Sequence, residues 1–403
     1  MKINIPLVIL LLLATLTSQA QISAKLIQFP DVSESQICFT FGDDIWIVDK
    51  NGGNANKLVS PKGRETNPKF SPNGQSIAYQ ANYDGNYDIY TLPVLGGVPQ
   101  RVTGHGMSEN IMDWTNDGEN ILFASSMKSG KQRWSQFYTV NKAGGIPEKL
   151  PVELGAFANL SADGSQIAFT DKSRVFRTWK RYRGGTAPDI HIMDMNTLES
   201  KNITNNNAND EMPMWHGTKI YYMSDNGPAK RNNIWLYDTA DESNKQITFF
   251  TDYDIHYPSK GPSDIVFEAG GKIQLLNLNT SKIKEIEINA IGDFTRIKPV
   301  TKSTKNNISN YNISPDGNRA VMEARGDVYT LPKKDGFVKN LTRTSGVAER
   351  FPAWSPDGKS IAYFSDKSGE YELYTRDVKS GKEKLCSNLG PGFRYNIYWS
   401  PDS

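Results

Sequence analysis

Cysteine and histidine are scarce in this sequence, which has two cysteines and four histidines among its 403 residues. Cys38 and Cys386 stand near opposite ends of the chain. A disulfide between them is not favoured, and we expect both to be small apolar residues of strands. No HExxH motif is present, and no two histidines have metal-ligand spacing. The sequence therefore predicts no metal site from His105, His191, His216 or His256.

Long apolar runs are missing after the first twenty residues. The opening stretch "MKINIPLVILLLLATLTSQA" carries one lysine, an apolar run over 5–16, and small residues at 18 and 20. This order is typical of a secretory signal peptide, and the run is too short to span a bilayer. We predict a signal peptide over 1–20, a secreted chain in a periplasmic or extracellular location, and no stable membrane insertion.

Neither sign of charge dominates, since 46 lysines and arginines face 44 acidic residues and the net charge is +2. Binding to nucleic acid without regard to sequence depends on a broad positive field, so we expect no nucleic-acid partner. One local exception lies around "RTWKRYRGG" (177–185). Five cations fall there within ten residues with no acid among them, namely Arg174, Arg177, Lys180, Arg181 and Arg183.

Familiar catalytic and cofactor motifs are also lacking. There is no GxSxG nucleophile elbow and no GxxxxGK[ST] phosphate loop. The segment "NYDGNYDIY" (82–90) resembles a calcium loop, but it lacks the closing glutamate and the spacing of that motif. The paired glycines recur at one place in each repeat, as hairpin turns do. No catalytic residue, cofactor or metal is assigned.

What the sequence does contain is a repeat. The segments "PKFSPNGQSIAYQANYDGNYDIYTLPVLGGVPQRVT" (68–103) and "PAWSPDGKSIAYFSDKSGEYELYTRDVKSGKEKL" (352–385) each hold four β-rich stretches separated by turn residues. The unit returns roughly every 44 residues, as β-propeller blades do. The turn glycines that mark it are Gly74, Gly118, Gly164, Gly217, Gly261, Gly317 and Gly358. An all-β propeller is therefore predicted.

Two spacings between these glycines are long. The step from Gly164 to Gly217 contains the basic stretch, which indicates an insertion within the fourth blade. The step from Gly261 to Gly317 contains "IGDFTRIKPVTKSTKNNISNYN", which is polar and has the composition of a linker. We predict a six-bladed β-propeller of four-stranded blades over 21–298 and a linker over 299–312.

The copies after the linker are expected to form the first two blades and the start of a third over 313–403. Two blades cannot close a ring and would leave strand edges exposed, so we expect the front part of a longer protein.

Each of the first six copies holds four strands. We therefore expect the first ring to close by side-chain packing between blades one and six, without a strand from the other end. Four tryptophans are expected to begin innermost strands and pack between blades: Trp114, Trp215, Trp354 and Trp399.

Three segments carry a family resemblance: "WKRYRGG" (179–185), "DEMPMWHGTKIYYMSDN" (210–226) and "TDYDIHYPSKGPSDIVFEAGGKIQLLNL" (251–278). Together with the TolB/WD40-like repeats, they resemble the N-terminal propeller region of the Tricorn protease family. The resemblance implies that a second propeller of seven blades, a helical domain, a PDZ domain and a serine-protease core follow. It also implies assembly into a homo-oligomer. The catalytic core has no counterpart in these residues, so the chain is predicted to be inactive alone.

In that family the propellers act as filters and channels for peptides beside the active site. The resemblance thus implies gating of substrates or products, with peptides as partners. Lys180, Arg181 and Arg183 are candidates for contacting peptide carboxylates, because cationic side chains bind such groups. Alternatively, these side chains cover a neighbouring blade or bridge subunits. A second reading of the whole chain is a stand-alone TolB-like envelope propeller that binds a protein partner.

Overall fold

The computed structural model describes residues 21–59, 61–130, 134–292, 294, 297 and 300–403. The chain divides into two compact units, 1–298 and 299–403. The predicted signal peptide over 1–20 lies outside the described residues. Within the described part of the chain, no helix has the length and apolar character that crossing a membrane requires.

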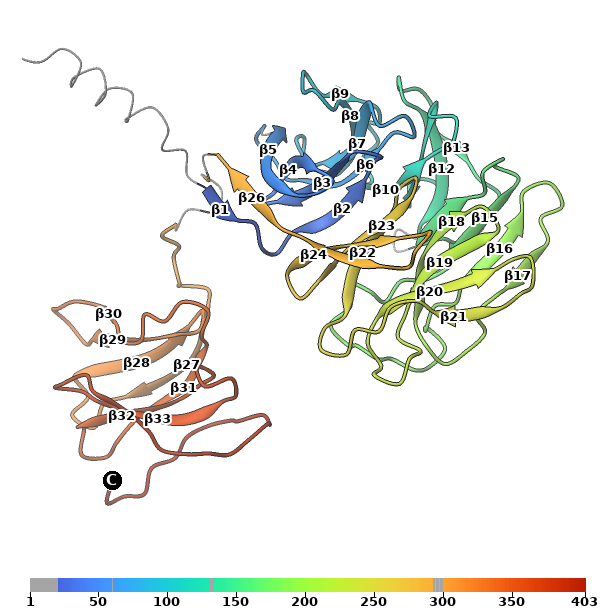
Figure 1. The fold of residues 1–403 in the computed structure, drawn as a ribbon. Helices are drawn as coiled ribbons and strands as arrows, with labels where there is room; N and C mark the ends of the chain where they lie inside the picture. Colours follow the sequence, from blue (N-terminus) through green and yellow to red (C-terminus); the bar gives the residue numbers. More distant parts are fainter. Residues whose placement is uncertain (1–20, 60, 131–133, 293, 295–296, 298–299) are drawn as a thin grey trace, which may run out of the picture. The chain divides into compact units, whose positions relative to one another are not determined.

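Six sheets make up the described part of the first unit (Figure 1). Five have four antiparallel strands in chain order, and the first sheet has two additional strands. We number the six sheets as blades one to six in chain order. Blades one and two contain β2 (Gln28–Val32), β3 (Gln36–Phe41), β4 (Asp44–Asp49) and β5 (Gly53–Val59), and then β6 (Glu65–Phe70), β7 (Ser76–Ala81), β8 (Asp88–Pro93) and β9 (Gln100–Arg101). Blades three and four contain β10 (Glu109–Trp114), β11 (Asn120–Ser125), β12 (Gln136–Asn141) and β13 (Glu148–Lys149), and then β14 (Phe157–Leu160), β15 (Gln166–Thr170), β16 (His191–Asp194) and β17 (Ser200–Asn202). Blades five and six contain β18 (Asp210–His216), β19 (Lys219–Ser224), β20 (Asn233–Asp238) and β21 (Asn244–Gln246), and then β22 (Ile255–Lys260), β23 (Asp264–Ala269), β24 (Lys272–Asn277) and β25 (Ile283–Ile286).

The first strands of the six sheets form a closed cycle. β2 contacts β6, β6 contacts β10, and the series continues through β14 and β18 to β22, which contacts β2 again. This is the arrangement of propeller blades around a central axis, so the predicted all-β propeller is confirmed.

Turn chemistry explains why each repeat folds into a blade. In the turn before β32 (Ser360–Ser365), the Ser355 hydroxyl donates to Asp357 Oδ1 at 2.7 Å and accepts the Ser360 N–H at 2.9 Å. Gly358 follows with φ of 69°, a conformation that favours glycine. The predicted turn of the WSPDG unit is therefore present.

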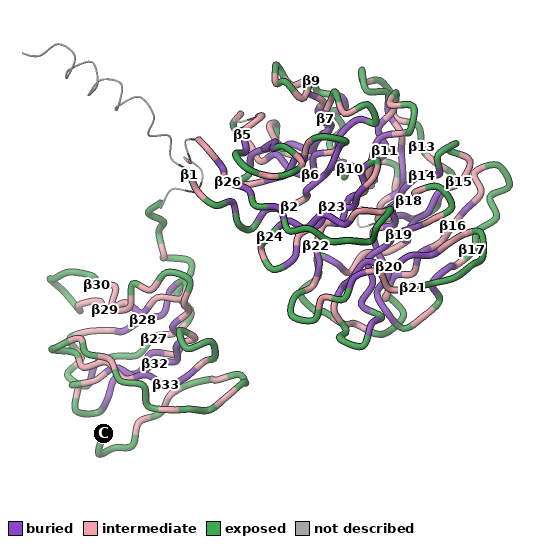
Figure 2. Tube along the Cα trace, in the orientation of Figure 1, coloured by how far each residue is buried: buried purple, intermediate pink, exposed green. Residues whose placement is uncertain are grey.

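The apolar core lies between neighbouring sheets rather than in one central mass. Figure 2 shows the buried segments concentrated in strands, whereas the connecting turns are exposed. Trp114 and Trp215 are buried in clusters that join two adjacent blades, and the Trp114 indole N–H donates to the Lys69 carbonyl of the preceding blade at 3.0 Å. The predicted packing role of Trp114 and Trp215 is confirmed, and Trp354 is likewise buried between the two sheets of the second unit. Trp399 lies in none of the strands that the structure describes, so its expected place in an innermost strand is wrong. Trp114 and Trp215 lie at the ends of β10 and β18, so the expectation that they begin these strands is wrong.

Ring closure differs from the prediction. A strand that follows the sixth blade, β26 (Ile288–Ile291), pairs in parallel with β5 of the first blade, and β1 (Gln21–Ser23) pairs antiparallel with β26. Closure by side-chain packing alone is therefore wrong. The physical reason is that β26 satisfies the backbone groups of the β5 edge and also buries Ile288 and Ala290.

The described part of the second unit has two four-stranded sheets whose first strands contact each other. They contain β27 (Ile308–Ile313), β28 (Arg319–Ala324), β29 (Asp327–Pro332), β30 (Lys339–Asn340); and β31 (Glu349–Trp354), β32, β33 (Glu372–Asp377), β34 (Glu383–Leu385). The predicted linker over 299–312 is thus too long, because 308–312 belong to β27. This strand is mostly exposed, which explains its lack of an apolar signal.

Both thiols are free. Cys38 is buried in β3 as expected, whereas Cys386 is exposed just beyond β34, so its expected place within a strand is wrong.

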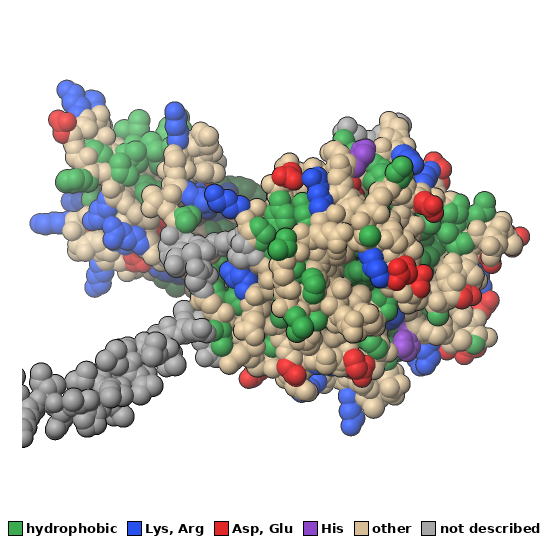
Figure 3. Space-filling model, turned by 90° about the horizontal axis from the view of Figure 1, so that it is seen from above, with side chains coloured by type: hydrophobic (Ala, Val, Ile, Leu, Met, Phe, Trp, Pro, Cys, Tyr) green, Lys and Arg blue, Asp and Glu red, His purple; other side chains and the backbone are tan. Residues whose placement is uncertain are grey.

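Charges of both signs are interspersed over the face of the first unit seen in Figure 3.

Candidate functional site

A backbone irregularity recurs in the innermost strands of the first unit. The pairing register shifts within β2, β6, β10, β18 and β22, which marks a β-bulge in each of these strands. In four of them the residue at the bulge has a positive φ: Phe29 (48°), Asn67 (53°), Met212 (59°) and Tyr257 (51°). Because a bulge bends the strand and redirects a side chain, these four positions present their side chains differently from regular strand residues.

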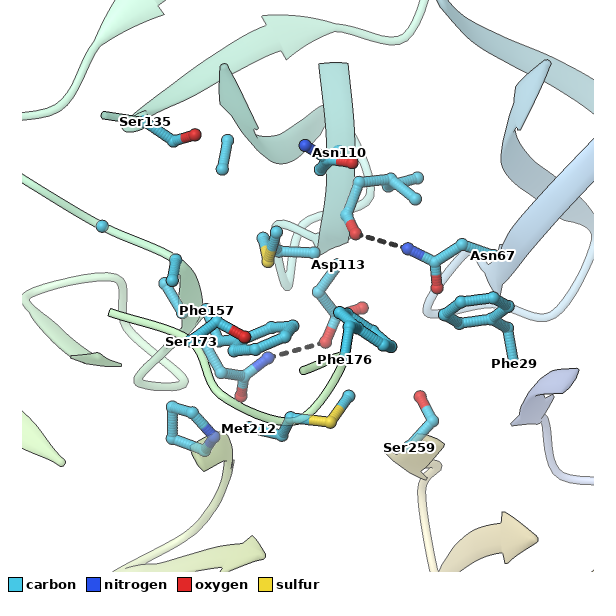
Figure 4. A pocket seen from close by; sticks show the side chains of 18 of the residues that line it. Phe29, Asn67, Asn110, Asp113, Ser135, Phe157, Ser173, Phe176, Met212 and Ser259 are labelled. Carbon is cyan, nitrogen blue, oxygen red and sulfur yellow. Dashed lines mark hydrogen bonds between the residues drawn. The ribbon is translucent and has the colours of Figure 1, made fainter. Parts of the chain in front are cut away.

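A cavity of about 700 Å³ lies at the centre of the ring and is bordered by residues from all six innermost strands. Figure 4 shows side chains from separate blades converging on it, among them Phe29, Asn67, Asp113, Phe157 and Met212. The cavity is therefore a product of the whole ring, because no single blade encloses it.

An aromatic collar lies at this site, and we define it as Phe29, Phe157, Phe176 and Tyr257. The first three border the cavity, and Tyr257 packs against Phe29. The Phe29 and Tyr257 ring centroids are 4.3 Å apart. Phe176 lies 6.2 Å from the centroid of each of the other three rings. Three of these residues come from blades one, four and six, and Phe176 comes from the insertion of blade four.

A polar collar lies two residues further along the strands, formed by Asp31, Lys69, Asp113, Asn159 and Ser259. The Asn159 amide donates to Asp113 Oδ2 at 2.7 Å, and the Ser259 hydroxyl donates to Asp31 Oδ1 at 2.5 Å. Lys69 also bonds to Ser259, and its ammonium group lies 3.8 Å from Asp31. Burial raises the pKa of Asp31, although the charge of Lys69 acts in the opposite direction. These contacts join blade three to blade four, blade one to blade six, and blade two to blades one and six around the cavity.

The predicted insertion of blade four forms an arm, which we define as residues 173–183, between β15 and β16. The Arg174 N–H donates to both carboxylate oxygens of Glu211 at 2.9 Å, and the side chain of Val175 is buried in the core between blades five and six. Burial raises the pKa of Glu211 to about 7, although the hydrogen bonds from the arm lower it. The arm is thus anchored at its base, and its Phe176 reaches the aromatic collar.

The three predicted site residues lie on this arm and all have partners in the protein. The Lys180 ammonium donates to the Val175 carbonyl at 3.0 Å. Arg181 Nη2 lies 2.7 and 2.9 Å from the two oxygens of Asp254. Arg183 Nη1 lies 2.9 Å from Asp225, whose side chain is 2% exposed.

The contact of Arg183 agrees with the interpretation that these cations cover a neighbouring blade, since Asp225 follows β19 of blade five. Arg181 instead reaches Asp254, which precedes β22 of blade six, and Lys180 bonds within the arm. None of the three side chains borders the cavity among the residues that the structure describes. Contact between them and peptide carboxylates stays a prediction.

Sequence reasoning missed the residues that border the cavity. Arg177 and Lys260 both line it, and within the described ranges neither side chain has a hydrogen-bond or ion-pair partner. The aromatic collar was missed as well. A signal existed for it, because Phe29, Phe157 and Tyr257 each stand three residues before the position that Trp114 and Trp215 occupy in their blades.

Comparison with known proteins identifies relatives of most of the chain. A family model described as "Tricorn protease N-terminal beta propeller domain" matches residues 24–282. A "Tricorn protease homolog" of Saccharolobus solfataricus is 26% identical over 382 residues, which are 89% of this chain and 35% of that protein. A "Putative Tricorn-like protease N-terminal subunit" of Sulfurisphaera tokodaii is 30% identical over 168 residues, which are 40% of this chain and 84% of that protein.

Among solved structures, a crystal structure of the tricorn protease matches with a TM-score of 0.64 and 22% identity. The match covers 92% of this chain and 36% of that chain, and it shows a common fold. The chain therefore spans about a third of the length of the longer relatives it matches.

Proposed function

Since the chain belongs to the Tricorn protease N-terminal β-propeller family, we propose that its first unit selects peptides for a Tricorn-like protease. Extended peptides enter or leave through the central cavity, whereas folded proteins are excluded by its size. Serine-protease chemistry is performed by a part of the protease other than residues 1–403, and the enzyme works in the periplasm or outside the cell.

The observation that carries this proposal is the central cavity itself. Side chains of all six innermost strands border it, and it has an apolar layer beside a polar one. An extended peptide presents side chains and backbone amides together, so a site with both kinds of surface suits it. The arm is held in place beside the cavity and its Phe176 borders the open space. This supports a lined, selective passage at the centre of the ring rather than a solid core.

Blocking the cavity tests the proposal. Asn110 is exposed and borders the cavity (Figure 4), so an Asn110→Trp side chain would occupy space that peptide requires. Binding of an unlabelled peptide of about ten residues to the full chain would be measured by isothermal titration calorimetry. We expect the variant to weaken binding at least about tenfold, which corresponds to 1.4 kcal/mol.

The matched control is Asn196→Trp, which places the same bulk on an exposed turn between β16 and β17. This control should bind peptide as the unsubstituted chain does. Equal binding by Asn110→Trp would refute passage through the cavity. Cleavage of short fluorogenic peptides by the pure chain would refute the assignment of the chemistry to another part of the protease.

A further inference from the structure

We propose that the aromatic collar is a subsite for an aromatic or large apolar side chain of the bound peptide. This inference rests on the proposed function and adds a substrate class to it. The first unit would then select peptides by the type of their side chains as well as by their width.

Three of the four collar rings lie outside the cores between blades, whereas Phe157 packs against the core of blades five and six. Phe29, Phe176 and Tyr257 belong to none of the buried apolar clusters formed by the described residues. Phe176 is 57% exposed, and Phe29 and Tyr257 are only partly buried. Large apolar surface left accessible inside a cavity is typical of a binding site, because core aromatics are normally covered.

Backbone conformation leads to the same conclusion. Phe29 and Tyr257 occupy the left-handed region, which bulky side chains disfavour and asparagine tolerates. Asn67 occupies the same region at the equivalent place in blade two, so the bulge does not itself require an aromatic residue. Unfavourable backbone conformations of this kind gather at functional sites.

The arm adds Phe176 to the rings that the innermost strands contribute to the subsite. Phe176 contacts rings from three different blades and is held there by the bonds from Arg174 to Glu211 at the base of the arm. Aromatic rings attract another aromatic ring through edge-to-face and offset contacts in addition to the apolar area that is buried. The hydroxyl and amide groups of the adjoining polar collar are already hydrogen-bonded within the protein, so selectivity at this subsite comes from the aromatic rings.

Two tetrapeptides that differ at one side chain test the inference, Gly-Ala-Phe-Ala and Gly-Ala-Ala-Ala. Their affinities for the full chain would be measured by isothermal titration calorimetry. Burial of the phenyl group predicts a preference of at least about tenfold for the phenylalanine peptide. Phe176→Ala should reduce this preference to below about threefold, and Phe176→Leu should retain part of it.

The control is Trp179→Ala, which removes another exposed aromatic side chain of the same arm that does not border the cavity. It should leave the preference unchanged. Equal affinity for the two peptides would overturn the subsite and leave the proposed passage intact. Failure of both peptides to bind would overturn the subsite together with the proposed function. Loss of the preference in Trp179→Ala as large as in Phe176→Ala would also overturn the subsite.

Discussion

Replacing Arg181 by alanine should lower the free energy of unfolding of the first unit by about 1–2 kcal/mol at pH 7. The guanidinium group lies 2.7 and 2.9 Å from the two oxygens of Asp254. Hydrogen bonds between charged groups contribute about 1.5–3 kcal/mol. The Arg181 side chain is 26% exposed and Asp254 keeps its bond from the Asn232 N–H, so we expect the lower part of this range.

The effect of Arg181→Ala should depend on pH. Burial raises the pKa of Asp254, but hydrogen bonds from the Asn232 N–H and Arg181, with the charge of Arg181, outweigh burial and lower the pKa. A carboxyl group with a lowered pKa in the folded state stabilises the protein above its unfolded pKa, and this stabilisation is lost as the pH falls through the folded pKa. The difference between the two proteins should therefore be complete at pH 7 and shrink below about pH 4.

Urea denaturation between pH 3 and 7, followed by tryptophan fluorescence, would measure this difference. Arg177→Ala is the matched control, because this arginine lies on the same arm and its side chain has no partner among the described residues. Its effect should stay within about 0.5 kcal/mol. Equal stabilities for Arg181→Ala and Arg177→Ala would refute the structural role of the ion pair. Weaker peptide binding with unchanged stability would instead favour contact with substrate.

Two further predictions concern a buried acid and the closing strand. Burial and the neighbouring Asp88 carboxylate raise the pKa of Glu109 to about 8, so stability should fall between about pH 4.5 and 8, by at most about 1.4 kcal/mol per pH unit. Glu109→Gln should remove this contribution in urea titrations, and an unchanged slope would contradict it. Ala290→Asp places a carboxylate at the fully buried pairing of β26 with β5, and should cost about 3–5 kcal/mol. Hydrogen exchange should then increase in both strands, whereas the partly exposed Asn289→Asp control should change it little.

Local features of this protein could be predicted from its sequence because they depend on residues close together in the chain. The WSPDG turns, the four-stranded repeat and the insertion in blade four each follow from a short segment. The burial of Trp114 and Trp215 between blades also follows, because a large apolar residue recurs at one place in the repeat. The strand over 308–312 was not predicted, because an exposed innermost strand has no alternation of apolar and polar residues.

Contacts between distant segments were decided only by the tertiary structure. The alternating apolar residues of β26 resemble those of any outer strand, and no nearby residue indicates that β26 pairs with β5. Arg181 pairs with an acid 73 residues away and Arg183 with one 42 residues away, so the basic stretch alone could not reveal that these cations are paired. The aromatic collar exists because a ring brings equivalent positions of separate blades to one axis, and a linear sequence does not encode that convergence locally.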